Sequence, residues 1–189
     1  MERRGRRTRR TGGPDVSSYA VDDGERLLLI DPTDPPEALA ELAVARDTAI
    51  LLTCPWHARD AHALVDRLGA RLYAPPPDGG NSESLPAEVF VAGDALPIGV
   101  TAYAGMEPND LVLWIESRQA LVTGDTLIDR GGGLEFPSDW ASRGAIAARG
   151  VPPDQIRASL RPLLELPVEH VLPTHGPPTD RAALERALA

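Results

Sequence analysis

One stretch, Ile50–His62 (ILLTCPWHARDAH), constrains the fold more than any other part of the sequence. Its apolar start is typical of a buried strand, and Pro55 prevents that strand from continuing as a central one. After the turn the apolar spacing becomes helical. His57, Asp60 and His62 therefore lie where a strand ends and a helix begins, a common position for ligand and metal groups in layered α/β folds. The same residues also fit a structural role, in which Asp60 caps the helix and the histidines are surface residues.

The composition indicates an ordinary globular domain. Of the 189 residues, 42% are hydrophobic and 25% are charged, which is enough to bury a core. The net charge of −9 is uneven, because residues 1–10 carry six arginines and one glutamate, a net +5, and the remainder carries −14. An acidic body argues against nucleic acid as the main partner. We predict a disordered Arg-rich arm over residues 1–14 and a single domain over residues 15–189.

The sequence also suggests where the protein acts. The Arg-rich arm is not followed by the apolar segment of a secretory signal, and no apolar run approaches the roughly 20 residues of a membrane-spanning helix. The single cysteine, Cys54, excludes an internal disulfide and fits a reducing compartment. We therefore expect a cytoplasmic protein whose partner is a small molecule, with no nucleic acid and no membrane, and whose oligomeric state the sequence does not define.

The apolar pattern predicts a chain rich in strands. The predicted strands are 16–21, 26–30, 48–53, 71–74, 89–92, 99–103, 111–116, 120–123 and 168–172, and the predicted helices are 35–45, 61–68, 152–166 and 179–188. Strands that follow one another without helices between residues 89 and 123 argue against a doubly wound sheet. We predict instead two hairpin-rich halves that pack sheet on sheet, with helices outside. Residues 124–150 are predicted to be a long irregular connection.

Two further polar stretches follow predicted strands. One places Gly124 and Asp125 after the strand at 120–123, and the other places His175 after the strand at 168–172. A glycine beside a charged residue at a strand end lets the backbone approach a ligand closely. Each stretch alone is equally compatible with an ordinary turn. Three such loops together indicate a metal site, because one ion needs ligands that converge from several loops.

The order of these motifs, from Val16 to the C-terminus, resembles the metallo-β-lactamase fold superfamily. Residues 17–32 (SSYAVDDGERLLLIDP) look like its first hairpin, and ILLTCPWHARDAH stands in place of its His-x-His-x-Asp-His loop. AGMEPND stands in place of a Gly-His-Thr-Pro segment. VTGDTLI stands in place of its Gly-Asp strand end, and HVLPTHGPP stands in place of its Pro-x-His-Gly segment. The resemblance implies an α/β (α+β) fold, a four-layered αββα sandwich with the metal site at one edge between the sheets. It also implies hydrolysis of esters, thioesters, lactones, lactams or phosphodiesters with one or two zinc or iron ions.

The metal-binding motif is degenerate in this chain, and its register is open. If His57 takes the place of the second histidine of the motif, Arg59 stands at the aspartate and Asp60 at the last histidine. If His57 takes the place of the first histidine, Arg59 stands at the second and His62 at the last. Met106 stands where the next histidine is usual, and a thioether is a poor zinc ligand.

The resemblance therefore implies a reduced site with at most one metal, either zinc or iron, or with none. The candidate metal ligands are His57, Asp60, His62, Asp125 and His175. Asp125 is also the candidate catalytic residue, as metal ligand or general base. We expect a hydrolase for a small ester-, thioester- or lactone-like substrate. The alternative is a non-catalytic member of the fold that binds a ligand or partner in the old cleft.

Three structural expectations follow. The side chains of His57, Asp125 and His175 should converge at one edge of the sandwich. Burying an unpaired carboxylate costs free energy, so we expect Arg59 to pair with Asp125 or Asp60 and to replace the charge of the second metal. We expect Met106 to lie in the cleft that the second metal would otherwise occupy. Residues 131–140 (GGGLEFPSDW) should form either a lid over the site or an ordinary surface loop.

Overall fold

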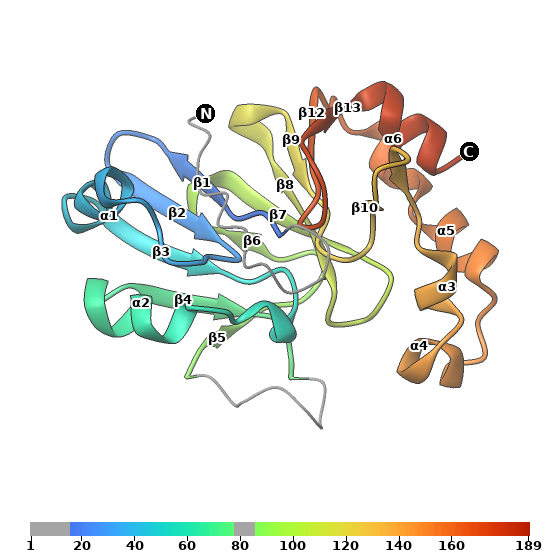
Figure 1. The fold of residues 1–189 in the computed structure, drawn as a ribbon, viewed down its shortest axis with the longest axis horizontal. Coiled ribbons are helices and arrows are strands. Elements are labelled where there is room, and N and C mark those ends of the chain that lie inside the picture. Colours follow the sequence, from blue (N-terminus) through green and yellow to red (C-terminus); the bar gives the residue numbers. More distant parts are fainter. Residues whose placement is uncertain (1–15, 78–85) are drawn as a thin grey trace.

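Two β-sheets pack face to face in the computed structural model, which describes residues 16–77 and 86–189 (Figure 1). Helices α1 (Glu37–Val44) and α2 (Ala61–Leu68) cover the outer face of the first sheet. Helices α5 (Pro153–Ser159) and α6 (Arg181–Ala187) cover the outer face of the second. The predicted Arg-rich arm lies outside the described residues.

The first sheet has the strand order β1-β2-β3-β4-β5. Its strands are β1 (Tyr19–Asp22), β2 (Arg26–Ile30), β3 (Asp47–Leu51), β4 (Arg71–Ala74) and β5 (Glu88–Val89). Only β1 and β2 form an antiparallel hairpin, whereas β2 to β5 pair in parallel. The prediction of a hairpin-rich half is wrong here, because α1 and α2 are crossover helices that return the chain to the same end of the sheet.

The second sheet has the order β13-β12-β9-β8-β7-β6 and is mostly antiparallel. Its strands are β6 (Ala95–Leu96), β7 (Val100–Ala104), β8 (Leu111–Ile115), β9 (Ala120–Val122), β12 (His170–Leu172) and β13 (Thr179–Asp180). The connection predicted to be irregular contains a small hairpin, β10 (Ile128–Asp129) and β11 (Leu134–Glu135), and two short helices, α3 (Ser138–Ala141) and α4 (Gly144–Ala148).

Short 3₁₀ helices lie in the connections between these elements. They are η1 (Pro55–His57), η2 (Pro97–Gly99), η3 (Glu116–Arg118) and η4 (Arg161–Glu165). The single helix predicted over residues 152–166 is divided into α5 and η4. Pro162 lies in the first turn of η4, and a proline inside an α-helix removes one backbone hydrogen bond and clashes with the preceding turn.

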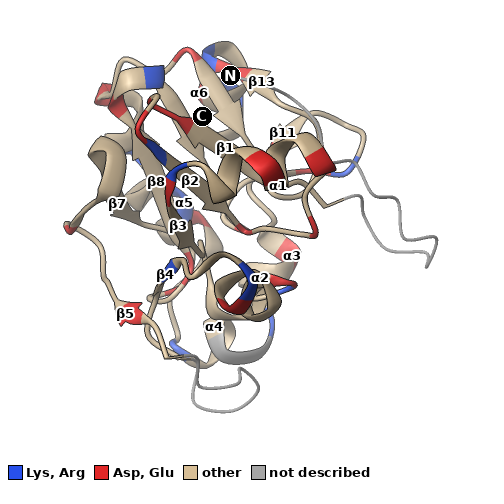
Figure 2. Cartoon of the chain, turned by 90° about the vertical axis from the view of Figure 1, so that its left-hand side faces the viewer, with Lys and Arg blue, Asp and Glu red and all other residues tan. Residues whose placement is uncertain are grey.

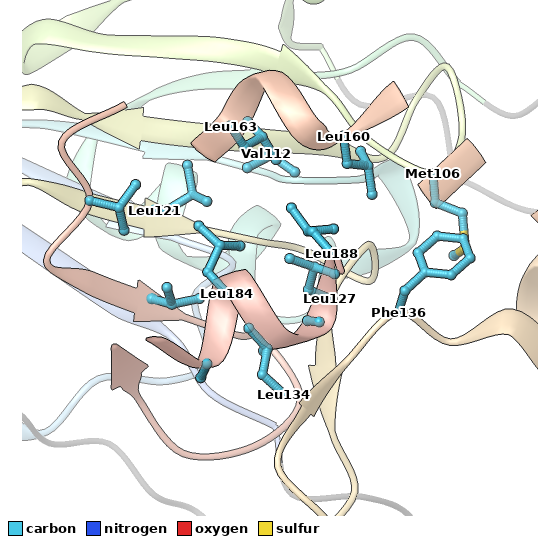
Figure 3. Close-up of a cluster of buried hydrophobic side chains, with 14 of the residues drawn as sticks. Met106, Val112, Leu121, Leu127, Leu134, Phe136, Leu160, Leu163, Leu184 and Leu188 are labelled. Atoms are coloured by element: carbon cyan, nitrogen blue, oxygen red, sulfur yellow. The ribbon is translucent and has the colours of Figure 1, made fainter. Parts of the chain in front are cut away.

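The alternation of side chains along the strands sorts the apolar residues into three cores. In β2, Leu28 and Ile30 face the core between the sheets, while Leu27 and Leu29 face α1 and α2. In β8, Leu113 faces inward, while its neighbours on either side face the helices of the C-terminal part. Figure 3 shows part of that outer core, with Leu184 and other side chains of α6 and η4 against the sheet. Three cores separate four layers, which confirms the predicted αββα sandwich.

The segment before β1 crosses from the first sheet to the second. Val16 forms an isolated antiparallel bridge with His175, and the backbone N–H of Ser17 donates to the carbonyl of Thr174 at 2.7 Å. The first described residues therefore hold the loop after β12 beside the end of β2.

Charged residues are dispersed over the outer elements. On the face shown in Figure 2, α1 and β5 carry acidic residues, β4 carries a basic residue, and α2 carries both kinds. The expectation that nucleic acid is not a partner stays a prediction. Within residues 16–77 and 86–189, no helix is long and apolar enough to cross a membrane.

Candidate metal centre

The first loop of the site is a 3₁₀ turn that follows β3. The turn η1 starts after Cys54, and the backbone N–H of His57 donates to the Cys54 carbonyl at 3.1 Å. The Sγ of Cys54 and a ring nitrogen of His57 lie within 4.8 Å of each other, so the two side chains face the same side of the turn. Their exposed fractions are 0% and 5%. Cys54 was not among the predicted ligands, although its spacing of three residues from His57 at a strand end was an available signal.

A buried carboxylate orients the imidazole of His57. Asp31, directly after β2, has its Oδ2 3.1 Å from His57 Nδ1, and the same oxygen accepts a hydrogen bond of 2.6 Å from the Thr53 hydroxyl. Because Nδ1 is engaged by Asp31, Nε2 is the nitrogen directed at Asp125, 3.3 Å from its Oδ1. Asp31 was not among the candidate site residues predicted from the sequence.

These neighbours change the protonation of His57 and Asp31. Burial lowers the pKa of His57, but the charge of Asp31 and the contacts with Asp125 outweigh burial and raise the pKa to about 9. Burial works in the opposite direction on Asp31, where the charge of His57 prevails and the net result is a lowered pKa. In the metal-free protein at neutral pH, His57 is therefore an imidazolium held between two carboxylates.

Asp125 lies in the loop after β9, at the centre of the site. Its Oδ1 lies 3.3 Å from His57 Nε2 and 3.1 Å from His175 Nε2, and its Oδ2 accepts a hydrogen bond of 2.7 Å from the Trp56 indole. The buried Oδ1 has no well-aligned hydrogen-bond donor among the described residues, although both imidazoles are within ion-pairing distance. Burial works to raise the pKa of Asp125, but the imidazoles of His175 and His57 and the Trp56 indole lower it overall.

A second buried acid, Asp110, supports the Asp125 loop. It lies just before β8, and its Oδ1 accepts from the Asp125 N–H at 3.2 Å while its Oδ2 accepts from the Thr126 hydroxyl at 2.6 Å. Gly124 has φ +55°, and a Cβ there would come within 2.5 Å of Asp110 Oδ1, so the close approach requires glycine. Burial, with the nearby charge of Asp125, raises the pKa of Asp110 well above its usual range. No pattern in the sequence distinguished this residue.

His175 joins the site from the loop after β12. Its ring meets that of Trp140 edge to face, with ring centroids 6.0 Å apart, and Arg130 lies over the Trp140 ring at 5.0 Å. Trp140 belongs to α3, so the segment 131–140 covers this edge of the site through its aromatic residue. The structure thus brings His57, Asp125 and His175 together, as predicted.

Asp60 and His62 do not join them. Both side chains are exposed, Asp60 accepts a hydrogen bond from the backbone N–H of Asp34 at 2.8 Å, and His62 lies on α2. Their prediction as ligands is a misassignment of register, because the 3₁₀ turn directs His57 inward and the following residues lead out to the exposed face of α2.

Arg59 and Met106 also differ from prediction. The Nη1 of Arg59 donates to the backbone carbonyls of Ser17 at 2.9 Å and Asp31 at 2.8 Å, so the predicted pairing with Asp125 or Asp60 is wrong. A positive φ of 43° at Arg59 turns the chain toward those carbonyls. Met106 is not a cleft residue: it is 3% exposed and packs in the outer core beside Phe136 (Figure 3).

Three donor atoms lie close enough together to share one ion. The Sγ of Cys54, a ring nitrogen of His57 and a carboxylate oxygen of Asp125 all lie within 4.8 Å of one another. A tetrahedral ion with bonds of about 2.0–2.3 Å places its ligand atoms roughly 3.5 Å apart, so small side-chain adjustments suffice. The donor types, and the buried Oδ1 without an aligned donor, fit a divalent transition metal.

Comparison with known proteins agrees with this architecture. No protein-family model matches the chain, and a search of curated protein sequences found no match. Among solved structures, TTHA1623 in a di-iron-bound form is 28% identical, with a TM-score of 0.67 over 94% of this chain and 96% of that one. The B3 metallo-β-lactamase BLEG-1 is 20% identical, with a TM-score of 0.67 over 93% of each chain. A metallo-β-lactamase from Pontibacter korlensis is 16% identical, with a TM-score of 0.69 over 97% of this chain and 90% of that one. With its two stacked sheets, its outer helices and a cluster of histidine, cysteine and aspartate side chains at their common edge, the chain has the metallo-β-lactamase fold.

Proposed function

We propose that the chain is a metal-dependent hydrolase with one ion bound at the seam between the two sheets. The observation that carries the proposal is the convergence of His57 and His175 on one buried oxygen of Asp125, at 3.3 and 3.1 Å. A buried carboxylate oxygen without an aligned donor is stabilised by a cation. The similarity to TTHA1623, which was solved with two irons, supports a metal at this edge.

The chain's own residues prepare this site for an ion. Asp31 holds Nδ1 of His57, an arrangement typical of metal-binding histidines, whose second nitrogen is fixed by a carboxylate. Trp56 fixes Oδ2 of Asp125 and leaves Oδ1 directed at the imidazoles. A divalent ion in such a site acts as a Lewis acid and lowers the pKa of a water molecule that it binds.

The substrate class follows from this chemistry. Water activated near neutral pH attacks carbonyl carbons, so we propose a small ester, thioester or lactone as substrate. His175 Nε2 lies 3.1 Å from Asp125 Oδ1, and the Trp140 ring packs edge to face against the His175 ring.

The test combines metal analysis with a hydrolysis screen. Protein purified without chelator should contain up to one zinc or iron per chain and hydrolyse members of an ester, thioester and lactone panel. Asp125→Asn keeps the side-chain shape but removes its charge, and should lose both metal and activity. Asp60→Asn, at an exposed position, serves as the matched control and should lose neither. Activity that survives complete chelation would contradict the proposal.

One observation favours the alternative, a non-catalytic member of the fold. The charge of Asp125 is matched within the chain by His57, whose pKa of about 9 makes it cationic at neutral pH. In that case His57 and Asp125 form a buried ion pair without a metal, and the cleft that holds the active site in catalytic members of the fold binds a ligand or partner. Wild-type protein that binds neither zinc nor iron at micromolar concentration would favour this alternative.

A further inference from the structure

We propose that Cys54 is a ligand of the ion, so that Cys54, His57 and Asp125 form the ligand set and a fourth position stays open. The inference rests on the proposed function and specifies its metal site. Its basis is the group of three donor atoms within 4.8 Å of one another, which brings a thiol to the carboxylate at the centre of the site.

The local backbone produces this arrangement. Cys54 is extended, with φ −151° and ψ 156°, and directly precedes η1, and its Sγ lies within 4.8 Å of a ring nitrogen of His57. The hydrogen bond of 3.1 Å between the His57 N–H and the Cys54 carbonyl fixes this spacing. A sulfur and an imidazole are therefore presented together before any ion binds.

The surroundings of Cys54 are those of a ligand rather than of a core residue. A buried free cysteine usually packs as a small hydrophobe. Cys54 is fully buried but belongs to none of the three hydrophobic cores among the described residues, and its sulfur lies 3.9 Å from the Thr53 hydroxyl. Met106, the other sulfur residue near the site, packs inside a hydrophobic core.

In this proposal His175 is not a metal ligand, although the sequence predicted it as one. Its Nε2 contacts Asp125 Oδ1 at 3.1 Å, but it does not belong to the close group of three. It is a positioning residue, which acts on the ion through the Asp125 carboxylate.

The thiolate has a chemical consequence for the choice of metal. Three protein ligands with an open fourth position are typical of catalytic zinc sites, whereas structural sites have four. Thiolates select zinc and cobalt(II) over manganese and magnesium, which prefer oxygen ligands. Metal binding would release the thiol proton to solvent. Because a thiolate is a soft ligand, this ligand set would favour zinc over harder ions.

Cobalt(II) gives a direct readout, because a thiolate bound to it produces a charge-transfer absorption in the near ultraviolet. The chain has one cysteine, so such a band reports Cys54 alone. Metal-free wild-type protein titrated with cobalt(II) should develop the band and saturate at one equivalent. Cys54→Ser and Cys54→Ala should bind cobalt more weakly and lack the band, while Met106→Leu should keep it.

The possible results distinguish failure of the Cys54 proposal from failure of the proposed hydrolase function. Cobalt binding by wild type without the band overturns the role of Cys54 and leaves the metal-dependent hydrolase standing. Failure of wild type to bind cobalt or zinc overturns both. If the Cys54 variants do not fold, the wild-type protein still decides, because its cobalt(II) complex either shows the charge-transfer band, as we expect, or lacks it, which would overturn the thiolate.

Discussion

The residue with the most unusual surroundings is His57, whose two ring nitrogens face two different acids. Asp31 lies 3.1 Å from one nitrogen and Asp125 lies 3.3 Å from the other. Such a residue is either a cation itself or the ligand of a cation, because a neutral ring would present a lone pair to a carboxylate. The pH dependence of the stability of the metal-free protein tests whether His57 is itself the cation.

We expect metal-free protein to lose stability as the pH rises. The pKa of His57 is about 9 in the folded protein and about 6.5 when unfolded, so its contribution is fully present below pH 6.5 and is lost as the pH rises through 9. The difference corresponds to an upper value of about 3 kcal/mol. Urea unfolding in chelator between pH 6 and 10 measures it, and His57→Gln should flatten the profile. An unchanged slope in that variant would contradict the assignment.

Asp31 and Asp125 act in the opposite direction from His57. The pKa values of Asp31 and Asp125 are lowered in the folded protein, so their contributions are present above about pH 4 and are lost as the pH falls. We expect metal-free protein to be most stable between about pH 5 and 6.5. Asp31→Asn should weaken the loss at low pH, as followed by the acid-unfolding midpoint.

Arg59 stabilises backbone rather than the charge of the site. Arg59→Ala removes the side-chain donor of the Ser17 carbonyl and one of the two donors of the Asp31 carbonyl, which keeps the Ser18 hydroxyl; this should cost about 1–3 kcal/mol. Arg67→Ala is the matched control, because Arg67 pairs with Asp34 on the exposed surface, where such pairs contribute about 0–1 kcal/mol. The melting temperatures of the two variants measure the difference. Equal melting temperatures would show that the Arg59 contacts do not stabilise the fold.

At the scale of elements, the end of β7 and the Asp125 loop depend on one glycine. A Cβ at Gly105 would overlap the Asp110 carbonyl and the Thr126 hydroxyl, which itself donates to Asp110 and accepts from the Met106 N–H. Gly105→Ala should therefore destabilise the protein by about 1–3 kcal/mol and reduce metal content. Gly132→Ala has open space around its Cβ and should change neither. Chemical unfolding and metal analysis of both variants provide the comparison.

Elements with strong apolar patterns were predictable from the sequence. The buried strands β2, β3 and β8, and the helix α2 with its C-terminal Gly69, follow from local periodicity and capping. The parallel pairing of β2 to β5 did not, because pairing depends on contacts between distant residues. The direction of His57 also could not be predicted, since it depends on a short 3₁₀ turn, and neither could that of Arg59, whose φ is positive. Asp125 and His175 were found because each directly follows a buried strand.

At the scale of the molecule, the candidate ligands come from both sheets. Cys54 and His57 follow β3 of the first sheet, whereas Asp125 and His175 follow strands of the second. An ion bound by residues of both sheets stabilises only the complete sandwich. At zinc concentrations about 100 times Kd, the gain should be about 2.7 kcal/mol, measured as a higher melting temperature with zinc than with chelator. Asp125→Asn should show no such difference, and an equal gain in that variant would place the ion elsewhere.

The bridge between Val16 and His175 has a consequence for the order in which a nascent chain matures. A neighbouring hydrogen bond, from the Ser17 hydroxyl to the Gly176 carbonyl, joins residues 159 positions apart. The strands and crossover helices of the first sheet leave the ribosome early, and their local contacts allow them to form first. The contact between His175 and Asp125 forms only after β12 and its loop have been translated. In a newly made chain the three candidate ligands are therefore present before the residue that positions Asp125.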